Sequence, residues 1–298
     1  MAKSFKELLD LAKRNGAKKI AVAVAEDFDV LSAVKEAYDQ NIVKPILIGN
    51  AEKIKDVAKK VKLNLDGIEI IDEGESIEAC RKAVSIVSSQ KADILMKGLV
   101  DTSIIMKQVL DKEIGLRTDK VISHVGVFCV PTYPKLFILT DAAMNIAPNL
   151  EYKKKILENA VEFAHSLDIK NPKVAVVCAK EKVYKKMEST IDAKELEDMN
   201  KRGEIKDCTV IGPLALDNAI SKEAAIHKGV DNPVSGDVDI FLMPNIEAGN
   251  IMYKTLTFLA KAQNAAVIVV AKSPIVLTSR TDTAETKLNS IVLSALMV

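Results

Sequence analysis

Short apolar segments alternate with amphipathic segments along nearly the whole chain. The apolar segments predict strands at residues 19–25, 45–49, 68–72, 92–97, 173–179, 208–211, 238–243 and 265–271. Helical spacing of apolar positions predicts helices at residues 4–15, 30–40, 51–61, 76–90, 103–112, 150–168, 182–201, 221–228, 249–263 and 282–296. Because short, uninterrupted apolar strands are typical of a sheet covered on both faces, the pattern predicts an α/β fold with mainly parallel sheets.

The alternation breaks once, where the apolar segments 121–130 and 136–140 follow each other without a helix between them. Two successive strands indicate an antiparallel insertion or the crossing into a second domain. The 298 residues suffice for two domains of about 150 residues each, or for one large domain. Since no linker rich in Pro, Gly or Ser separates the halves, we expect any crossing between two domains to be direct.

The amino-acid composition and the net charge limit the kinds of macromolecule that this protein is expected to bind. Hydrophobic residues make up 48% of the chain and charged residues 28%, with a formal net charge of +1. This balance favours neither nucleic acid nor an anionic membrane as a partner. No apolar segment approaches the ~20 residues of a membrane-spanning helix, and the N-terminus lacks the apolar core of a secretion signal. We therefore expect a cytoplasmic protein.

Several common motifs are missing. No two of the 12 glycines are separated by a single residue, so a dinucleotide fingerprint is absent. The P-loop motif G-x-x-x-x-G-K-[ST] is also absent. The chain also lacks the G-x-S-x-G motif of α/β-hydrolases. Its four cysteines and three histidines are widely spaced, which disfavours a disulfide framework and a zinc site. We expect no bound metal.

Polar residues that directly follow strands are the first candidates for a site, because ligands of open α/β sheets bind beyond the carboxyl ends of the strands. Ser279 and Arg280 follow the last predicted strand and precede a helix, whose N-terminus favours an anion. Arg280 is one of only five arginines, and its bidentate fork suits phosphate or carboxylate. The alternative is an ordinary loop with a solvated arginine.

Asp282 and Glu285 carry a similar ambiguity. Their spacing fits a capping box, with Asp282 as the N-cap and Glu285 three residues later. Either carboxylate also fits a general base. The local pattern leaves both interpretations open.

A second candidate segment contains Asn250 and Lys254, which lie one turn apart on the same face of a predicted helix. A glycine before them allows close approach of the backbone, as in an oxyanion or phosphate cradle. The alternative is an ordinary strand-to-helix loop. Weaker signals follow two other strands, namely Lys97 and Gly98 after the first and Asp141 and Asn145 after the second.

Five segments together carry a resemblance to a known family: MKGLVDTS, TDAAMNIAP, GPLALDNA, NPVSGDVDIFLMPNIEAGNIMYKTL and PIVLTSRTDT. With these segments the chain resembles the phosphate acetyltransferase and phosphate butyryltransferase family from about residue 15 to its end. The combination of EAGNxxYK with a later PIxxTSR is specific. The chain looks closer to the butyryl branch than to the acetyl branch.

The resemblance implies transfer of an acyl group between coenzyme A and phosphate: acyl-CoA plus phosphate gives acyl phosphate plus CoA. Coenzyme A is then a substrate, no cofactor is permanently bound, and a homo-oligomer (a dimer or larger) is expected. The implied fold is the two-domain α/β fold of isocitrate and isopropylmalate dehydrogenases, with an interdomain cleft. Its C-terminal segment returns to the first domain, so we expect one domain at residues 1–126 plus 265–298 and another at 127–264.

The family's functional residues carry over unevenly. By resemblance, Ser279 contacts the reacting acyl or thiol group and Arg280 holds phosphate. Asn250, Tyr253 and Lys254 match the family's GNxxYK motif. The other expected substrate-binding residues are Lys97, Gly98, Asp141, Asn145 and Lys287.

The proton-exchanging base is where the chain departs from the family. Acetyl-transferring members resemble one another in a carboxylate seven positions after the serine, and that position is Thr286 here. Asp282 and Glu285 are the remaining candidates. None of the four cysteines falls in the candidate segments, so we expect direct transfer in a ternary complex.

Three alternative functions remain. The first is phosphate acetyltransferase activity. The second, from another class, is a metal- and NAD-dependent decarboxylating dehydrogenase of the same fold, which the scarcity of arginine disfavours. The third is a non-catalytic protein that binds CoA or phosphate.

Overall fold

A computed structural model describes residues 4–269 and 271–298, and the chain divides into two compact units. Phe5–Ile122 and Ala265–Val298 form what we call the N-terminal unit. Ser123–Asn264, together with Ser4, forms the central unit. From the sequence we expected the second domain to begin at residue 127. Residues 1–3 of the expected first domain, and Val270 in the last long predicted strand, lie outside the described residues.

The N-terminal unit is a sheet with helices. Its strands are β1 (Lys18–Ala23), β2 (Val43–Gly49), β3 (Glu69–Asp72), β4 (Ile94–Lys97), β10 (Gln263–Val269) and β11 (Ile275–Val276). Its helices are α1 (Phe5–Arg14), α2 (Phe28–Asp39), α3 (Ala51–Val61), α4 (Ser76–Ser88), α5 (Thr102–Val109) and α11 (Ala284–Leu296). The strands follow the order β3-β2-β1-β4-β11-β10, parallel throughout except for the β10/β11 pair.

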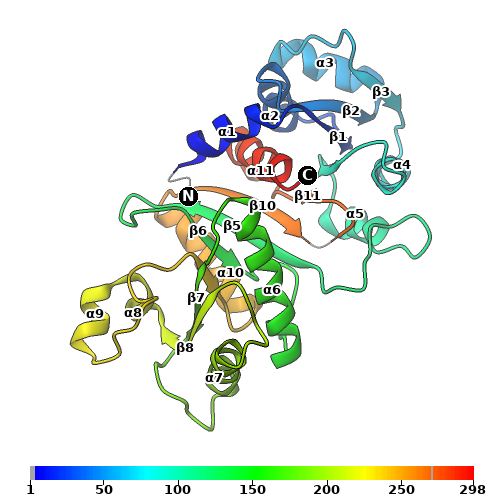
Figure 1. Cartoon of the computed structure of the whole chain (residues 1–298). Helices are drawn as coiled ribbons and strands as arrows, with labels where there is room; N and C mark the ends of the chain where they lie inside the picture. The colour runs from blue at the N-terminus through cyan, green and yellow to red at the C-terminus, as the bar shows by residue number, and fades with distance from the viewer. Residues whose placement is uncertain (1–3, 270) are drawn as a thin grey trace. The chain divides into compact units, whose positions relative to one another are not determined.

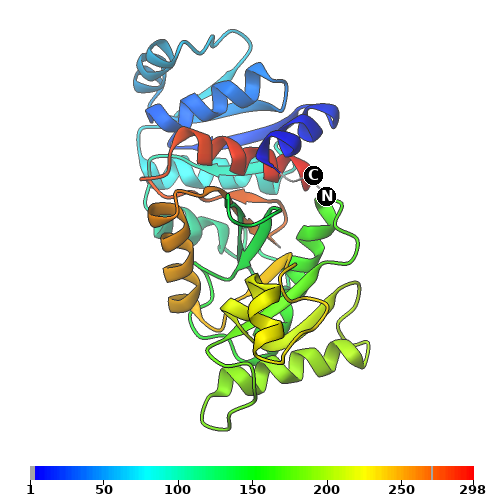
Figure 2. The same cartoon turned by 90° about the vertical axis from the view of Figure 1, so that its left-hand side faces the viewer.

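The two ends of the chain meet in this unit. Helix α11 packs against α1 and α2, and the red helix lies beside the blue ones in both views (Figures 1 and 2). Strand β11 pairs with β4, so that Ile275 lies opposite Leu95 and Val276 opposite Met96. The segment that follows β11 therefore leaves the sheet at the same edge as Lys97, the last residue of β4.

The other strands belong to the central unit. Its strands are β5 (Ser123–Cys129), β6 (Phe137–Thr140), β7 (Lys173–Cys178), β8 (Thr209–Ala215) and β9 (Ile240–Leu242), in the order β5-β6-β9-β7-β8. Its helices are α6 (Leu150–Ser166), α7 (Glu188–Lys201), α8 (Leu216–Ile220), α9 (Lys222–His227), α10 (Ile246–Lys254) and the π-turn η1 (Thr255–Leu259). Strands β5 and β6 are antiparallel, as in the first of the two interpretations of the break in the alternation.

Several helix boundaries differ from the prediction because of their capping residues. Helix α11 begins at Ala284, since the side chain that caps it is that of Thr283, which accepts the Thr286 N–H, and not that of Asp282. Helix α10 begins at Ile246, because the Asn245 side chain accepts from the Ala248 N–H. Within the described residues, no helix is long and apolar enough to cross a membrane.

A buried ion pair joins α6 and α7 in the central unit. Lys153 and Asp192 are 6% and 8% exposed, and the lysine Nζ lies 2.7 Å from Asp192 Oδ2. Desolvation of two buried charges is offset only while both partners are present. Lys153 therefore exemplifies a buried lysine whose charge is balanced by a carboxylate, and other buried lysines of the chain can be compared with it.

We expect Asp192→Ala to lower the free energy of unfolding by about 3 kcal/mol or more, because it leaves the Lys153 ammonium buried without its partner. The double substitution Lys153→Met with Asp192→Leu is expected to recover most of that loss. Urea denaturation of both variants measures this. A loss below about 1 kcal/mol for the single variant contradicts the assignment.

Candidate active site

Cationic and hydroxyl side chains gather at one edge of the sheet in the N-terminal unit. They lie at the end of β4, in the loop between β4 and α5, in the loop between β11 and α11, and in the first two turns of α11. Together with a glycine and two carboxylates of the same segments, this group contains seven of the predicted site residues: Lys97, Gly98, Ser279, Arg280, Asp282, Glu285 and Lys287. The other five, Asp141, Asn145, Asn250, Tyr253 and Lys254, lie in the central unit.

The loop after β4 packs tightly against the end of β1. The Gly98 N–H donates to Ala23 O at 2.8 Å, and the Leu99 N–H donates to Val24 O at 2.8 Å. A Cβ atom on Gly98 would lie 2.1 Å from Val24 O, so only glycine fits here. Val24 itself has a φ of 54°, a left-handed conformation that a β-branched residue rarely adopts. This close packing fixes the position of Lys97.

An ion pair connects the two loops of the site. Arg280 Nη2 lies 2.7 Å from Asp101 Oδ1, and Asp101 is the residue that precedes α5. The two side chains are 60% and 56% exposed. Exposed ion pairs contribute little net stability, typically below ~1 kcal/mol, so Arg280 can exchange this carboxylate for another anion at small cost.

The Asp282 side chain stabilises the loop that contains Ser279. Its carboxylate, 7% exposed, accepts the Ser279 N–H at 2.7 Å. The Ser279 hydroxyl lies 3.0 Å from that of Thr281. The capping-box interpretation of Asp282 and Glu285 is wrong, because Thr283 is the N-cap and Glu285 is an exposed residue in the first turn of α11.

Two lysines of the group are buried. Lys97 and Lys287 are each 3% exposed. Lys97 Nζ donates to Gly98 O at 3.3 Å and to Val100 O at 3.1 Å. Lys287 Nζ donates to the carbonyl oxygens of Ser279, at 3.5 Å, and of Asp282. Burial lowers the pKa of the Lys97 ammonium, and the positive charges of Lys287 and Arg280 lower this pKa further.

In the central unit, Asp141 organises the loop after β6. Its carboxylate accepts the N–H groups of Ala143 at 2.8 Å and of Met144 at 2.9 Å, and the side-chain amide of Asn145 at 2.6 Å. Four lone-pair positions of a carboxylate are thereby largely used within the loop. Asp141 and Asn145 thus contact each other, and the Asp141 carboxylate stabilises the loop.

The residues of α10 pack against this loop. Asn250 Nδ2 donates to Ala142 O at 3.2 Å, and a Cβ on Gly249 would lie 2.2 Å from Asp141 O. Tyr253 is 7% exposed, and its ring lies edge-on to that of Phe128, with 5.0 Å between centroids.

The half-buried Lys254 lies at the end of the same helix. Its ammonium lies 5.6 Å from the ring centroids of Tyr253 and Phe258. Asn250 and Lys254 therefore offer polar groups along α10, whereas the Tyr253 ring contributes to the core.

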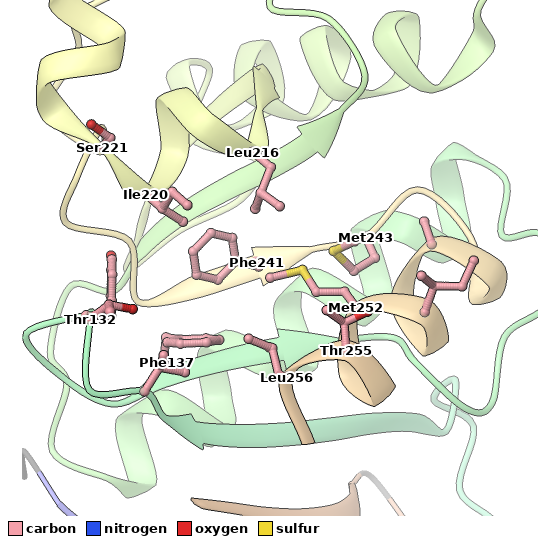
Figure 3. A pocket seen from close by; sticks show the side chains of 14 residues that line it. Thr132, Phe137, Leu216, Ile220, Ser221, Phe241, Met243, Met252, Thr255 and Leu256 are labelled. Carbon is pink, nitrogen blue, oxygen red and sulfur yellow. The ribbon is translucent and has the colours of Figure 1, made fainter. Parts of the chain in front are cut away.

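The central unit also contains an apolar cavity of about 590 Å³ (Figure 3). Its labelled lining includes Phe137 and Phe241 from the sheet, Leu216 and Ile220 from α8, and Met252 from α10. No charged side chain lines it. The cavity is suited to apolar groups and not to phosphate.

Two polar residues of the site in the N-terminal unit are not among the predicted site residues. Asp101 stands within the segment MKGLVDTS before a helix, and that position was a signal for it. Thr278, 3% exposed, has a hydroxyl with no hydrogen-bond partner among the described residues. It stands within the segment PIVLTSRTDT directly before Ser279, and that position was a signal for it. The described chain contains no group of three or more His, Cys, Asp or Glu residues placed to hold a metal ion.

Comparison with known proteins covers nearly the entire chain. Residues 4–80 and 76–295 match the family described as "Phosphate acetyl/butaryl transferase". A phosphate butyryltransferase of Clostridium beijerinckii is 50% identical over 297 residues, covering 100% of this chain and 98% of that protein. The crystal structure of a branched-chain phosphotransacylase from Enterococcus faecalis is 33% identical with a TM-score of 0.82, covering 94% of this chain and 98% of that one.

A 4-hydroxythreonine-4-phosphate dehydrogenase from Klebsiella pneumoniae has a TM-score of 0.59 at 12% identity, covering 94% of this chain and 99% of that one, a likeness in fold alone. These structural likenesses confirm the predicted α/β fold of the isocitrate dehydrogenase type. The family expected from the five sequence segments is confirmed by the match over residues 4–295 and by 50% identity at full length. The chain belongs to the phosphate acetyl/butyryl transferase family.

Proposed function

We propose that this protein is a phosphate butyryltransferase, which converts a short-chain acyl-CoA and inorganic phosphate into an acyl phosphate and CoA. The observation that carries this proposal is the 50% identity to a phosphate butyryltransferase over 100% of the chain. The cationic group at the sheet edge of the N-terminal unit supports it, because a phosphate dianion needs such donors.

Arg280 and Ser279 are the residues that contact the reacting groups in this proposal. Arg280 exchanges Asp101 for phosphate and orients the attacking oxygen with its planar fork. Ser279 donates its hydroxyl to the oxyanion that forms when phosphate attacks the thioester carbonyl. Asp282 is a positioning residue, since its carboxylate holds the backbone N–H of Ser279.

The proton on the CoA sulfur is exchanged by Glu285 in this proposal. Asp282 is already hydrogen-bonded to the Ser279 backbone and is 7% exposed, whereas Glu285 is exposed in the first turn of α11. A thiol has an ordinary pKa near 8.5, so its ionisation at neutral pH needs such a partner.

The remaining predicted residues bind substrate in supporting roles. Lys97, with the adjoining Gly98, and Lys287 contribute positive charge beside Arg280. Asn250 and Lys254 offer donors along α10. Asp141 with Asn145, and the buried Tyr253, hold the loop and helix that present those donors.

Acyl transfer is proposed to be direct, within a ternary complex. Burial raises the pKa of Cys80 to about 12, of Cys178 to about 11 and of Cys208 to about 12, so these thiols remain protonated at neutral pH. Burial also raises the pKa of Cys129. Protonated thiols are poor nucleophiles, which supports a mechanism without an acyl-cysteine.

The cellular setting follows from the proposed substrates. Coenzyme A acts as a substrate, no cofactor is permanently bound, and the enzyme works in the cytoplasm without a nucleic-acid or membrane partner. A homo-oligomer is part of the proposal. Two exposed apolar side chains support this, because exposed apolar patches mark interaction surfaces. They are Ile251 (66%), which lines the apolar cavity, and Leu259 (81%), which lies in η1 together with the lining residue Leu256.

Phosphate acetyltransferase activity is the second candidate, favoured by the family match, which covers both acyl groups. A panel of acyl-CoAs from acetyl to hexanoyl, with thiol release followed by a thiol reagent, tests both. We expect phosphate-dependent release that rises from acetyl to butyryl. Fastest release with acetyl-CoA favours the second candidate. No phosphate-dependent release with any member overturns both and favours a binding protein or a dehydrogenase.

Arg280→Ala is expected to lower phosphate-dependent turnover about 100-fold or more, because one preorganised charged donor is lost. Arg202→Ala is the matched control, since Arg202 is half-exposed and pairs with Glu195 and Glu204 in the central unit. Steady-state kinetics with butyryl-CoA compare the two. Near-normal turnover of Arg280→Ala would remove this residue from the site.

Glu285→Gln is expected to lower kcat by about 100-fold, the usual contribution of a positioned proton-transfer group. Glu223→Gln is the control, because Glu223 is also an exposed carboxylate in the first turn of a helix. The pH profile of kcat for both variants separates the roles. An unchanged profile for Glu285→Gln assigns proton exchange to another group.

A further inference from the structure

Two buried lysines of the N-terminal unit lack the carboxylate partner that buried lysines normally have. Lys97 and Lys287 are each 3% exposed, and within the described part of the chain neither ammonium forms an ion pair. Lys153 of the central unit, 6% exposed, has Asp192 at 2.7 Å. Because an unpaired buried charge is costly, the difference calls for a physical explanation.

Backbone carbonyl groups accept hydrogen bonds from only some of the N–H donors of each lysine ammonium. An ammonium group has three N–H donors. Lys97 contacts the carbonyls of Gly98 and Val100, and Lys287 contacts those of Ser279 and Asp282. One donor of each lysine therefore remains for an acceptor that the described chain does not supply.

The neighbouring charges leave an excess of positive charge. The charges that act on Lys97 are the cations Lys287 and Arg280 and the carboxylates of Asp282 and Asp101. The Asp101 carboxylate is paired with Arg280, and the Asp282 carboxylate accepts the Ser279 N–H. Three cations thus face two carboxylates that are already engaged. An anion with two negative charges would relieve this repulsion.

A second observation at the same loop also indicates a ligand. The hydroxyl of Thr278 is buried, 3% exposed, and has no hydrogen-bond partner among the described residues. Buried hydroxyls are nearly always hydrogen-bonded. Thr278 directly precedes Ser279, whose carbonyl accepts from Lys287. The Lys287 ammonium therefore contacts the residue next to the one with the unsatisfied hydroxyl.

We propose that Lys97 and Lys287 together form the binding site of the attacking phosphate, which they hold as its dianion. Arg280 contacts the same phosphate from the solvent-exposed side. This inference rests on the proposed function and extends it from Arg280 to two buried residues. The shared chemistry is a phosphoryl dianion, which inorganic phosphate and the phosphate groups of CoA can both supply. We assign this binding site to inorganic phosphate.

A phosphate-binding role explains why the protein tolerates two unpaired buried charges. Replacing an unpaired buried ammonium with an apolar side chain of similar length removes its desolvation cost. The lysines therefore cost stability in the ligand-free protein and contribute to phosphate binding. A lysine with a purely structural role has the opposite signature, because its removal destabilises the fold.

Thermal denaturation of the full-length protein tests this signature directly. We expect Lys97→Met and Lys287→Met to have a Tm at or above that of the wild type in phosphate-free buffer. Inorganic phosphate is expected to raise the Tm of the wild type by mass action, with or without saturating CoA. Each substitution is expected to abolish most of that rise. Lys153→Met is the matched control, expected to lower the Tm and to keep the response to phosphate.

Steady-state kinetics separate the two sources of phosphate. Both substitutions are expected to raise the KM for phosphate roughly tenfold or more, the scale of a lost charge-assisted hydrogen bond. The KM for butyryl-CoA is expected to change less than about twofold, against that same scale. Lys97→Arg keeps the charge and is expected to recover part of the phosphate affinity.

The pH dependence supplies a further readout. In the wild type, the KM for phosphate is expected to rise with increasing pH, beginning below the ordinary pKa of lysine, as Lys97 loses its proton. Lys97→Met is expected to remove that part of the profile, and Lys153→Met to retain it.

Three results overturn the proposal. The first is a lowered Tm with an intact phosphate response in the Lys97 and Lys287 variants. The second is a raised KM for butyryl-CoA with an unchanged KM for phosphate, which assigns the binding site to a phosphate group of CoA. The third is the absence of any phosphate-induced rise in the wild-type Tm, with or without CoA. Because the thermal measurement needs no turnover, it decides this inference even if the wild type proves inactive with every acyl-CoA.

Discussion

The parallel pairing of β11 with β4 is the constraint on which the cationic group of the N-terminal unit depends. Ile275 lies opposite Leu95 and Val276 opposite Met96, so both strands end at the same edge of the sheet. The loops that follow therefore meet, although Asp101 and Arg280 are 179 positions apart in the chain. A strand of two residues thus brings together the cations and hydroxyls of two distant segments.

Backbone packing, more than side-chain pairing, holds these cations in place. The loop after β4 hydrogen-bonds to the end of β1, and Gly98 permits an approach that any other residue would block. Carbonyl groups of the same loops surround the Lys97 and Lys287 ammonium groups. Carbonyl dipoles partly replace water around a cation without neutralising it, so the charge remains available to an anion. Rigid preorganisation of this kind is what a reaction with a developing oxyanion requires.

Most of the fold could be predicted from the alternation of apolar and amphipathic segments, because strands and helices of this length carry their own periodicity. The prediction failed where the signal is short. The two residues of β11 have no period, and the capping of α11 by Thr283 instead of Asp282 is a choice between neighbours that local pattern does not separate. The helix predicted through residue 263 ends in a π-turn after Lys254, for which hydrophobic spacing gave no warning.

The sequence by itself determined the α/β class, the family, and the segments after the strands in which polar residues gather. Only the tertiary structure decided what each of those residues does: Asp141 is used within its own loop, Asp282 holds a backbone N–H, and Tyr253 belongs to a core. The same holds for Lys97 and Lys287, which the sequence marked as substrate-binding candidates without indicating that both are buried. The physical reason is that burial and hydrogen-bond partners depend on which distant segments the strand order brings together, and no local spacing of residues contains that order.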